Sequence, residues 1–327
     1  MQNSAAGDSR AAPEEGNLRV DGVLDLLISP QAGAPLARHG LELRGTDGSS
    51  YTLSRSGIPL FADEHCSTDA RRQQDHYNRI AAAYVENLGY PHTEEYMNTL
   101  DRALLATIDR PLGVTAELCC GRGEGFSLLG SRVARGVGVD ISLSMLELAL
   151  SHNRNADVAF VQADVTMLPL ATAAFDSVVM LGGVHHVRDR TSLFSEVSRI
   201  LKPGGRFYFR EPVSDLWFWR VLRWAIYRTS PTLDYQTERP LLWSETAPVL
   251  EGARLRIKSW KTYGFFGFCL FMNSDVLKFN RLFRFLPGIR IITRASARLD
   301  AAILGLPALG RCGLQVVGVA EKELEEC

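Results

Sequence analysis

Short apolar runs alternate with amphipathic stretches through the middle of the chain, from residue 111 to residue 212. The runs VTAELCC, GVGVD, VAFVQAD, FDSVVMLG and GRFYFREP are short and rich in β-branched or aromatic residues, as buried strands are. Amphipathic segments such as TSLFSEVSRIL lie between them, with apolar residues at helical spacing. Strands that alternate with helices at these intervals predict βαβ units and a parallel, doubly wound α/β sheet.

The segments before this region have different patterns. Residues 1–17 are small and polar, which predicts a disordered tail. Residues 18–64 contain short apolar pieces separated by turn signals, and Asp47-Gly48 predicts a hairpin within a small β module. From residue 65 to residue 110, apolar residues recur at i, i+3 and i+4, which predicts a helical region before an α/β domain at residues 111–327.

Composition and charge exclude several classes of protein. The 327 residues are 46% hydrophobic with a formal net charge of −1, which excludes disorder throughout and disfavours a basic nucleic-acid binder. The six cysteines form no CxxC pair, so we expect no metal held by thiolates. The N-terminus has no apolar secretory signal, and no run of about 18 apolar residues occurs, so we expect a soluble, cytoplasmic protein.

Four motifs occur in order along the predicted sheet. A glycine-rich loop from Glu117 to Gly125 (ELCCGRGEG) joins a strand to a helix, where missing side chains let the backbone approach a ligand. Asp140 ends the next strand, where a carboxylate accepts hydrogen bonds from a ribose diol, although it could also be a helix N-cap. Asp164 ends the third strand, and the fourth motif is FDSVVMLGGVHHVRD followed by EVSRILKPGG.

Together these motifs resemble those of the class I S-adenosylmethionine-dependent methyltransferases, in particular the branch that acts on small molecules. The resemblance is close over residues 116–205 and looser at LQVVGVAEKE near the C-terminus. It implies a Rossmann-like, seven-stranded sheet with helical cap insertions, S-adenosyl-L-methionine as the cofactor, and methyl transfer of the kind found in secondary metabolism.

The resemblance also implies which residues bind the cofactor. They are Glu117, Cys119, Cys120, Gly121, Gly123, Asp140, Ile141, Met145, Asp164, Val165, Leu181 and Tyr77. The glycine-rich loop would hold the methionine part, Asp140 the ribose, and Ile141, Met145, Asp164 and Val165 the adenine. Tyr77, with His76 and Tyr84, would form a lid over the methionine carboxylate, and the alternative for these three is ordinary helix packing.

One departure from the family pattern affects the glycine-rich loop. Cys119 occupies the position where the family has the first glycine of the loop. Cysteine is small, so the loop can still close, but its geometry is in question. For the pair Cys119-Cys120 we favour packing over a redox role.

Three residues are candidate general bases for the methyl acceptor. His185 and His186 follow the fourth strand, at the edge of the sheet where ligands bind in such folds. An imidazole there would deprotonate a hydroxyl or an activated carbon, and we favour His186. Glu211, after the fifth strand, is a further candidate base, and its alternative is a surface carboxylate paired with Arg210.

The N-terminal module resembles a zinc-ribbon-like module that is fused to, or partnered with, some methyltransferases. The frame is present as LLISPQA, LELRG and GIPLF, but Ser29 and Ala32 occupy the first two cysteine positions and no later pair exists. We therefore expect a degenerate module without zinc. The alternative is a β extension that packs on the main domain.

The C-terminal third is cationic and rich in aromatic residues. We expect helical insertions at about 213–240 and 267–313, where arginines are interleaved with apolar side chains. This surface suits a cap over a hydrophobic small molecule, a clamp for phosphate or carboxylate, or an interfacial membrane contact; the alternative is an ordinary helical subdomain.

The leading hypothesis is methyl transfer to a hydrophobic small molecule, such as a lipid, an isoprenoid or a polyketide-like metabolite, with no nucleic-acid partner. Two alternatives remain at the level of sequence. One is an RNA methyltransferase, which the missing cysteines and the neutral charge disfavour. The other is a cofactor-binding scaffold without catalysis, which the presence of both Asp140 and Asp164 disfavours.

Overall fold

The computed structural model describes residues 18–63, 66–75, 89–229, 239–272 and 278–324. The predicted tail at 1–17 and the predicted lid residues His76, Tyr77 and Tyr84 lie outside these ranges.

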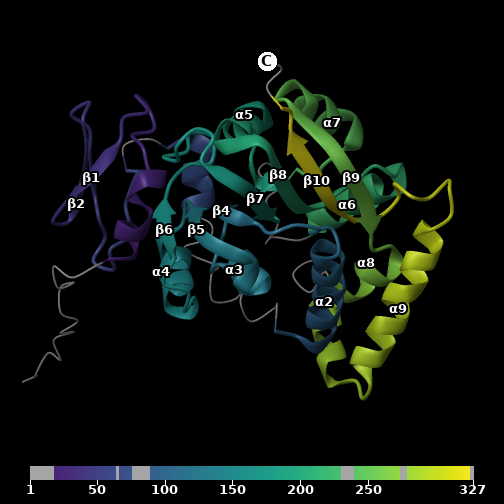
Figure 1. Cartoon of the computed structure of the whole chain (residues 1–327). Coiled ribbons are helices and arrows are strands. Elements are labelled where there is room, and N and C mark those ends of the chain that lie inside the picture. Colours follow the sequence, from purple (N-terminus) through teal and green to yellow (C-terminus); the bar gives the residue numbers. More distant parts are fainter. Residues whose placement is uncertain (1–17, 64–65, 76–88, 230–238, 273–277, 325–327) are drawn as a thin grey trace, which may run out of the picture.

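A seven-stranded sheet forms the centre of the molecule (Figure 1). Its strands are β4 (Gly113–Leu118), β5 (Val133–Asp140), β6 (Val158–Gln162), β7 (Phe175–Leu181), β8 (Leu201–Pro212), β9 (Leu255–Tyr263) and β10 (Gln315–Lys322). Their order is β6-β5-β4-β7-β8-β10-β9, with β10 antiparallel to both of its neighbours. The predicted Rossmann-like sheet of a class I methyltransferase fold is confirmed.

Helices cover both faces of this sheet. The helices α3 (Glu124–Leu129) and α4 (Leu143–His152) lie on one face, and α5 (Arg190–Ile200) and α7 (Trp243–Gly252) lie on the other (Figure 1). Successive side chains of a strand point to opposite faces, so in β7 Val178 and Met180 join the core under α5 and Val179 joins the core under α3 and α4. Burial on both faces explains why the strands read as continuous apolar runs.

The N-terminal module contains a small antiparallel sheet. The sheet consists of β1 (Leu36–His39), β2 (Glu42–Gly45) and β3 (Ser50–Thr52), and the 3₁₀ helix η1 (Arg19–Leu26) precedes it. The hairpin predicted at Asp47-Gly48 connects β2 to β3, and Gly48 has the positive φ (86°) that favours glycine. The predicted small β module is therefore present.

Hydrogen bonds occupy the position where a zinc ribbon would have its first cysteine. The hydroxyl of Ser29 donates to Asp47 (2.7 Å) and accepts from the backbone N–H of Ala34 (3.2 Å). No group of three or more His, Cys, Asp or Glu side chains that could hold a metal ion is found within the described ranges. The structure thus shows a small β module, and the zinc-ribbon-like character expected from the sequence is not shown within these ranges.

The module packs against the β6 edge of the main sheet (Figure 1, left). Leu60 pairs with Gln162 of β6, and Leu27 pairs with Leu170. Leu26, Leu43 and other apolar residues of the module belong to the same core as the sheet residues. This arrangement covers an edge strand that would otherwise present unpaired backbone groups.

A helical subdomain lies at the opposite end of the sheet. It comprises α2 (Pro91–Leu105), α6 (Trp217–Thr229), α8 (Phe266–Met272), η4 (Lys278–Phe285) and α9 (Ile289–Leu304). Its own core includes Tyr96, Trp219, Phe268 and Leu304. Within the described part of the chain, no helix is both long and apolar enough to span a lipid bilayer.

Candidate functional site

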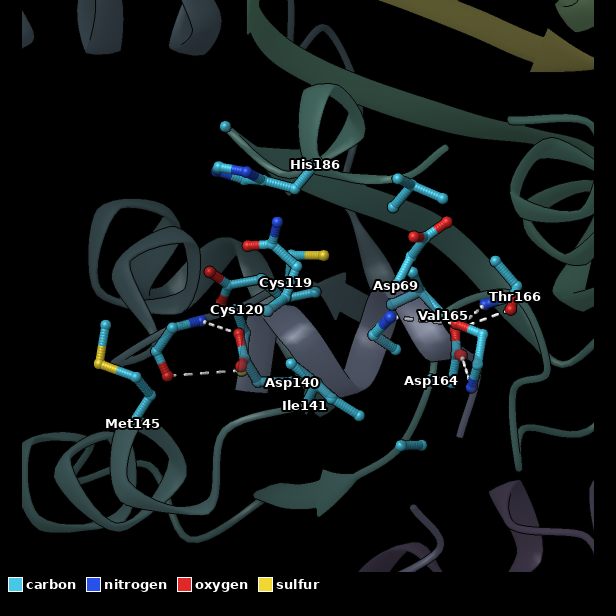
Figure 2. Close-up of a pocket in the computed structure, with 18 of the residues that line it drawn as sticks. Asp69, Cys119, Cys120, Asp140, Ile141, Met145, Asp164, Val165, Thr166 and His186 are labelled. Carbon is cyan, nitrogen blue, oxygen red and sulfur yellow. Dashed lines mark hydrogen bonds between the residues drawn. The ribbon is translucent and has the colours of Figure 1, made fainter. Parts of the chain in front are cut away.

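A cavity lies at the carboxyl ends of β4, β5 and β6 (Figure 2). Ten of the residues expected to bind the cofactor line it. They are Glu117, Cys119, Cys120, Gly121, Asp140, Ile141, Met145, Asp164, Val165 and Leu181. Gly123 is not among the lining residues, and Tyr77 lies outside the described ranges. The cavity stands at the edge where ligands bind in doubly wound sheets.

The glycine-rich loop turns through the left-handed region at every second residue. Cys119, Gly121 and Gly123 have φ angles of 49°, 51° and 75°. Glycine adopts this conformation without strain, whereas a residue with a Cβ does so at a cost. The loop closes despite the cysteine, but Cys119 adopts backbone geometry that is natural for the glycine of the family pattern.

Glu117 connects the end of β4 to the start of α3. Its two carboxylate oxygens accept hydrogen bonds from the backbone N–H groups of Gly125 (2.7 Å) and Phe126 (2.9 Å). Burial raises the pKa of Glu117 to about 8, and the two hydrogen bonds oppose this effect. The carboxylate thereby fixes the loop, and it also lines the cavity.

Asp140 occupies the centre of the site (Figure 2). One oxygen accepts from the N–H of Gly121 (2.8 Å) and the other from the N–H of Ser142 (2.9 Å). Burial raises the pKa of Asp140, and these bonds counteract it. Ser142, whose hydroxyl accepts from the N–H of Met145, is the N-cap of α4, so the alternative of Asp140 as this cap is incorrect.

Asp164 holds two segments together at the end of β6. One oxygen accepts from the backbone N–H and the hydroxyl of Thr166 (2.9 and 2.7 Å). The other accepts from the N–H of Ser67 (2.9 Å), which is 97 residues earlier in the chain. This bond places the start of the helical residues 68–75 at the rim of the cavity.

The three candidate bases occupy different environments. His186 lines the cavity (Figure 2). His185 and Glu211 are not among the lining residues, and Glu211 is fully buried. The rings of His185 and His186 are in contact, with centroids 3.8 Å apart. Of the three, His186 is the one whose side chain lines the cavity.

Glu211 instead organises the turn that carries both histidines. One of its oxygens accepts from the N–H groups of Gly183 (2.7 Å) and Val184 (2.9 Å). The other accepts from the N–H of His185 (3.3 Å) and contacts its Nδ1 (2.9 Å). Burial lowers the pKa of His185 and raises the pKa of Glu211 to about 7. Beside an ionised Glu211, a neutral His185 ring donates through Nδ1. The structure thus differs from the prediction of Glu211 as a substrate-facing base or as a surface partner of Arg210, which pairs with Asp101.

Several lining residues were not predicted from the sequence. Ser67, Asp69 and Gln73 come from the segment before the sheet, and Arg188 and Asp189 follow the histidines. The Oε1 atom of Gln73 is buried and accepts no hydrogen bond from the described residues. Helical periodicity predicted this segment, but no motif marks Gln73 in the sequence.

The C-terminal helices contribute no described residue to the lining of this cavity. The last residue of the sequence that lines it is Asp189. The expectation that they cap the site is therefore not supported by the described contacts. They pack on each other and on α2 instead, because their inward aromatic side chains form a separate core.

Residues 116–209 match the family model described as a methyltransferase domain. This segment is therefore similar to methyltransferase domains. The matched segment includes Glu117, Asp140, Asp164 and His186, the carboxylates and the imidazole that line the cavity.

Curated relatives are similar to this chain over part of their length. The chain is 30% identical over 144 residues to the 2-phytyl-1,4-naphtoquinone methyltransferase of Nostoc punctiforme, which covers 41% of this chain and 61% of the relative. It is 31% identical over 134 residues to the 27-O-demethylrifamycin SV methyltransferase of Amycolatopsis mediterranei, which covers 37% of this chain and 49% of the relative. The chain thus spans about half to three fifths of these relatives.

A solved structure extends the similarity of the fold beyond this domain. A chain of the complex with the Haloferax volcanii Trm112 methyltransferase activator superimposes with a TM-score of 0.52. The match covers 78% of this chain and 99% of the other at 18% identity. At this identity the similarity concerns the fold alone.

Proposed function

We propose that the protein transfers a methyl group from S-adenosyl-L-methionine to a hydrophobic small molecule. The observation that carries this proposal is the cavity at the ends of β4, β5 and β6, where Glu117, Asp140 and Asp164 converge beside apolar side chains such as Ile141, Met145 and Val165. Carboxylates suit a ligand that carries a sulfonium, an ammonium and a ribose diol. The named relatives that act on a naphthoquinone and on a rifamycin support this class of acceptor.

The residues present fit this cofactor. Asp140 would accept from the ribose hydroxyls, Ile141, Met145 and Val165 would contact the adenine, and Glu117 with the glycine-rich loop would hold the methionine part. The buried Oε1 of Gln73 would accept from an N–H donor of the ligand. When bound, the cofactor supplies an electrophilic methyl group on a positively charged sulfur.

The residues of this chain would contribute alignment more than acid–base chemistry. Methyl transfer is an in-line displacement in which one bond to the methyl carbon forms as its bond to sulfur breaks, and the bonding electron pair remains on sulfur. Holding the acceptor in line and excluding water accounts for much of the rate. Where the acceptor carries a proton, His186, which lines the cavity, would remove it.

Cofactor binding is tested by titrating S-adenosylhomocysteine into the protein in a calorimeter. We expect Asp140→Asn to weaken binding by about tenfold or more, because a hydrogen bond to a charged group contributes about 1.5–3 kcal/mol. Asp157→Asn, which changes an exposed aspartate away from the cavity, is the control and should leave binding unchanged.

The acceptor class is tested by supplying labelled cofactor with either a prenylated demethylnaphthoquinone or ribosomal RNA stripped of its methyl groups. We expect label in the quinone. Label in RNA alone would overturn the proposal in favour of RNA methylation, and cofactor binding without turnover on either acceptor would favour a scaffold.

A further inference from the structure

The helix α9 carries three distinct stripes along its length. Residues spaced by three or four positions face the core of the helical subdomain: Ile289, Thr293, Ala297, Asp300 and Leu304. A second stripe consists of Arg290, Arg294 and Arg298. The third is apolar and exposed, and it includes Ile291, Ile292, Ala295 and Leu299. The exposed fraction of Ile291 is 70% and that of Leu299 is 62%. A helix that only packs on its own domain has no need for this third stripe.

The preceding helix η4 continues this surface. Phe279, Leu282 and Phe285 are spaced by three residues, and in a 3₁₀ helix such residues lie one above the other. Leu282 is 65% exposed and Phe285 is 68% exposed. Because η4 leads into α9 within four residues, at the lower right of Figure 1, we take the exposed apolar side chains of these two consecutive helices together as one surface. We call it the η4–α9 surface.

The residues of the η4–α9 segment carry many positively charged side chains and very few acidic ones. From residue 278 to residue 306 the sequence has five arginines and one lysine against one acid, Asp300. Asp300 is buried and accepts hydrogen bonds from the N–H groups of Phe265 and Phe268. Arg290 and Arg294 pair with Glu94 and Glu95 of α2.

Arg298 is the arginine of α9 that can bind an external anionic group. It is exposed and forms no ion pair with any residue of the described ranges. Exposed leucine, isoleucine and phenylalanine side chains bordered by arginines are the composition of helices that lie in a membrane interface.

We propose that the η4–α9 surface binds peripherally to an anionic lipid membrane. Its apolar side chains enter the boundary between headgroups and acyl chains, while its arginines contact anionic headgroups. A second copy of this chain fits less well, because a twofold interface would bring the two arginine-bordered surfaces together. The proposal does not depend on the methyl-transfer activity, although a membrane would also contain a lipid-like acceptor.

Vesicle flotation tests this proposal on the full chain without cofactor or acceptor. We expect the protein to float with phosphatidylcholine vesicles that contain phosphatidylglycerol and to remain in solution with phosphatidylcholine alone. Binding should weaken as salt is raised from 0.05 to 0.5 M, because salt screens the attraction between arginines and headgroups.

Matched variants locate the contact on the molecule. We expect Leu282→Ser combined with Leu299→Ser to lower partitioning about tenfold or more, because two exposed leucines no longer enter the lipid. Leu41→Ser combined with Leu324→Ser, which changes exposed leucines elsewhere, should have no effect. Arg298→Gln should lower partitioning about fivefold, because an arginine near an anionic membrane surface contributes about 1 kcal/mol of binding free energy. Arg132→Gln, which lies outside the η4–α9 surface, should not change partitioning.

Three results would overturn the proposal. They are equal binding to neutral vesicles, equal loss in the control and surface variants, and no vesicle binding at all. In the last case, sedimentation of a dimer that Leu282→Ser with Leu299→Ser converts to a monomer would assign the surface to self-association. Because methyl transfer is not measured, failure here leaves the proposed activity untouched.

Discussion

At the scale of single residues, Cys119 stands out because the backbone there favours glycine. Its φ of 49° lies in the left-handed region, and its Cβ lies so close to Gly183 that a Cβ added at Gly183 would approach it to 2.6 Å. The loop therefore tolerates a small side chain at this position but not a branched one.

We expect Cys119→Val to lower the free energy of unfolding by about 1–3 kcal/mol, because a β-branched residue adds strain in this conformation. Urea unfolding measures this change. Cys119→Gly should stay within about 1 kcal/mol of the wild type, since relief of strain and the greater entropy of the unfolded chain oppose each other. Cys269→Val, at a half-buried cysteine in α8, is the control for the loss of the thiol. Equal effects of valine at both positions would contradict the argument.

Glu211 is expected to affect catalysis indirectly, by positioning the turn that carries His185 and His186. We expect Glu211→Gln to lower kcat about tenfold or more while the affinity for S-adenosylhomocysteine changes less than threefold, because the carboxylate touches the histidine turn and not the cavity. An amide accepts through one oxygen only, so at least one of the N–H groups loses its partner.

The protonation of His185 distinguishes positioning from a purely structural role of Glu211. In the wild type, ¹⁵N NMR should show the proton on Nδ1, next to the carboxylate. In Glu211→Gln the resonance should shift toward the other tautomer. An unchanged tautomer together with unchanged kcat would show that Glu211 does not position the turn.

At the scale of elements, α6 combines two kinds of aromatic residue. Trp219 is 1% exposed, and its indole N–H donates to the carbonyl of Cys312 (2.7 Å), which links α6 to the segment before β10. Trp217, two residues earlier, is 64% exposed. Tryptophan thus packs in the core of the subdomain at one position of α6 and faces solvent at the other.

Replacing each tryptophan by alanine should separate these roles. We expect Trp219→Ala to lower the free energy of unfolding by about 3–5 kcal/mol, because it removes a large buried side chain and leaves a cavity. Trp217→Ala should change it by about 0.5 kcal/mol or less. Thermal and urea unfolding of both variants measure the difference, and similar losses would show that Trp217 is also packed.

The elements predictable from the sequence are those that local spacing specifies. Apolar runs separated by helical periods predicted the central sheet, and Asp47-Gly48 predicted a hairpin that the structure contains. The positions of Asp140 and Asp164 at strand ends placed both at one cavity, because parallel strands end at the same edge.

Contacts between distant segments could not be predicted in this way. The role of Glu211 depends on backbone N–H groups 26 to 28 residues away, and nothing in FREPVS indicates them. Likewise, α9 has two apolar stripes, and periodicity alone does not tell which one faces the core. Gln73 lies in the site on a segment that a hydrogen bond from Ser67 to Asp164, 97 residues later, joins to β6.

At the scale of the whole molecule, acid should destabilise the packing of the helical subdomain. His92 in α2 is fully buried next to Tyr90 and Phe283, and neither ring nitrogen has a hydrogen-bond partner within the described residues. Burial lowers the pKa of His92 below its ordinary value of 6.5. The folded state therefore favours the neutral ring, whereas the unfolded chain takes up a proton below about pH 6.5.

We expect the free energy of unfolding to decrease as the pH falls below 6.5, because the unfolded chain then binds more protons than the folded one. His92→Phe should reduce this decrease, since it removes the titrating group and retains a ring of similar size. Urea unfolding at pH 7.5 and pH 5.5 measures the difference between the two proteins. Parallel pH dependences would assign the acid sensitivity to other groups.

The N-terminal module pairs with β6, and the chain that leaves the module then forms part of the cavity wall. Pro59 and Phe61 exchange backbone hydrogen bonds with Gln162, and six residues after Phe61 the chain is bound at Ser67 to Asp164. Gln73 then lies on the cavity wall. A cleavage between residues 62 and 66 would break the peptide connection between these two anchor points. The central domain would keep its sheet, while the wall that carries Gln73 would no longer be continuous with the pairing at Gln162 and, of these two anchor points, would keep the Ser67–Asp164 hydrogen bond.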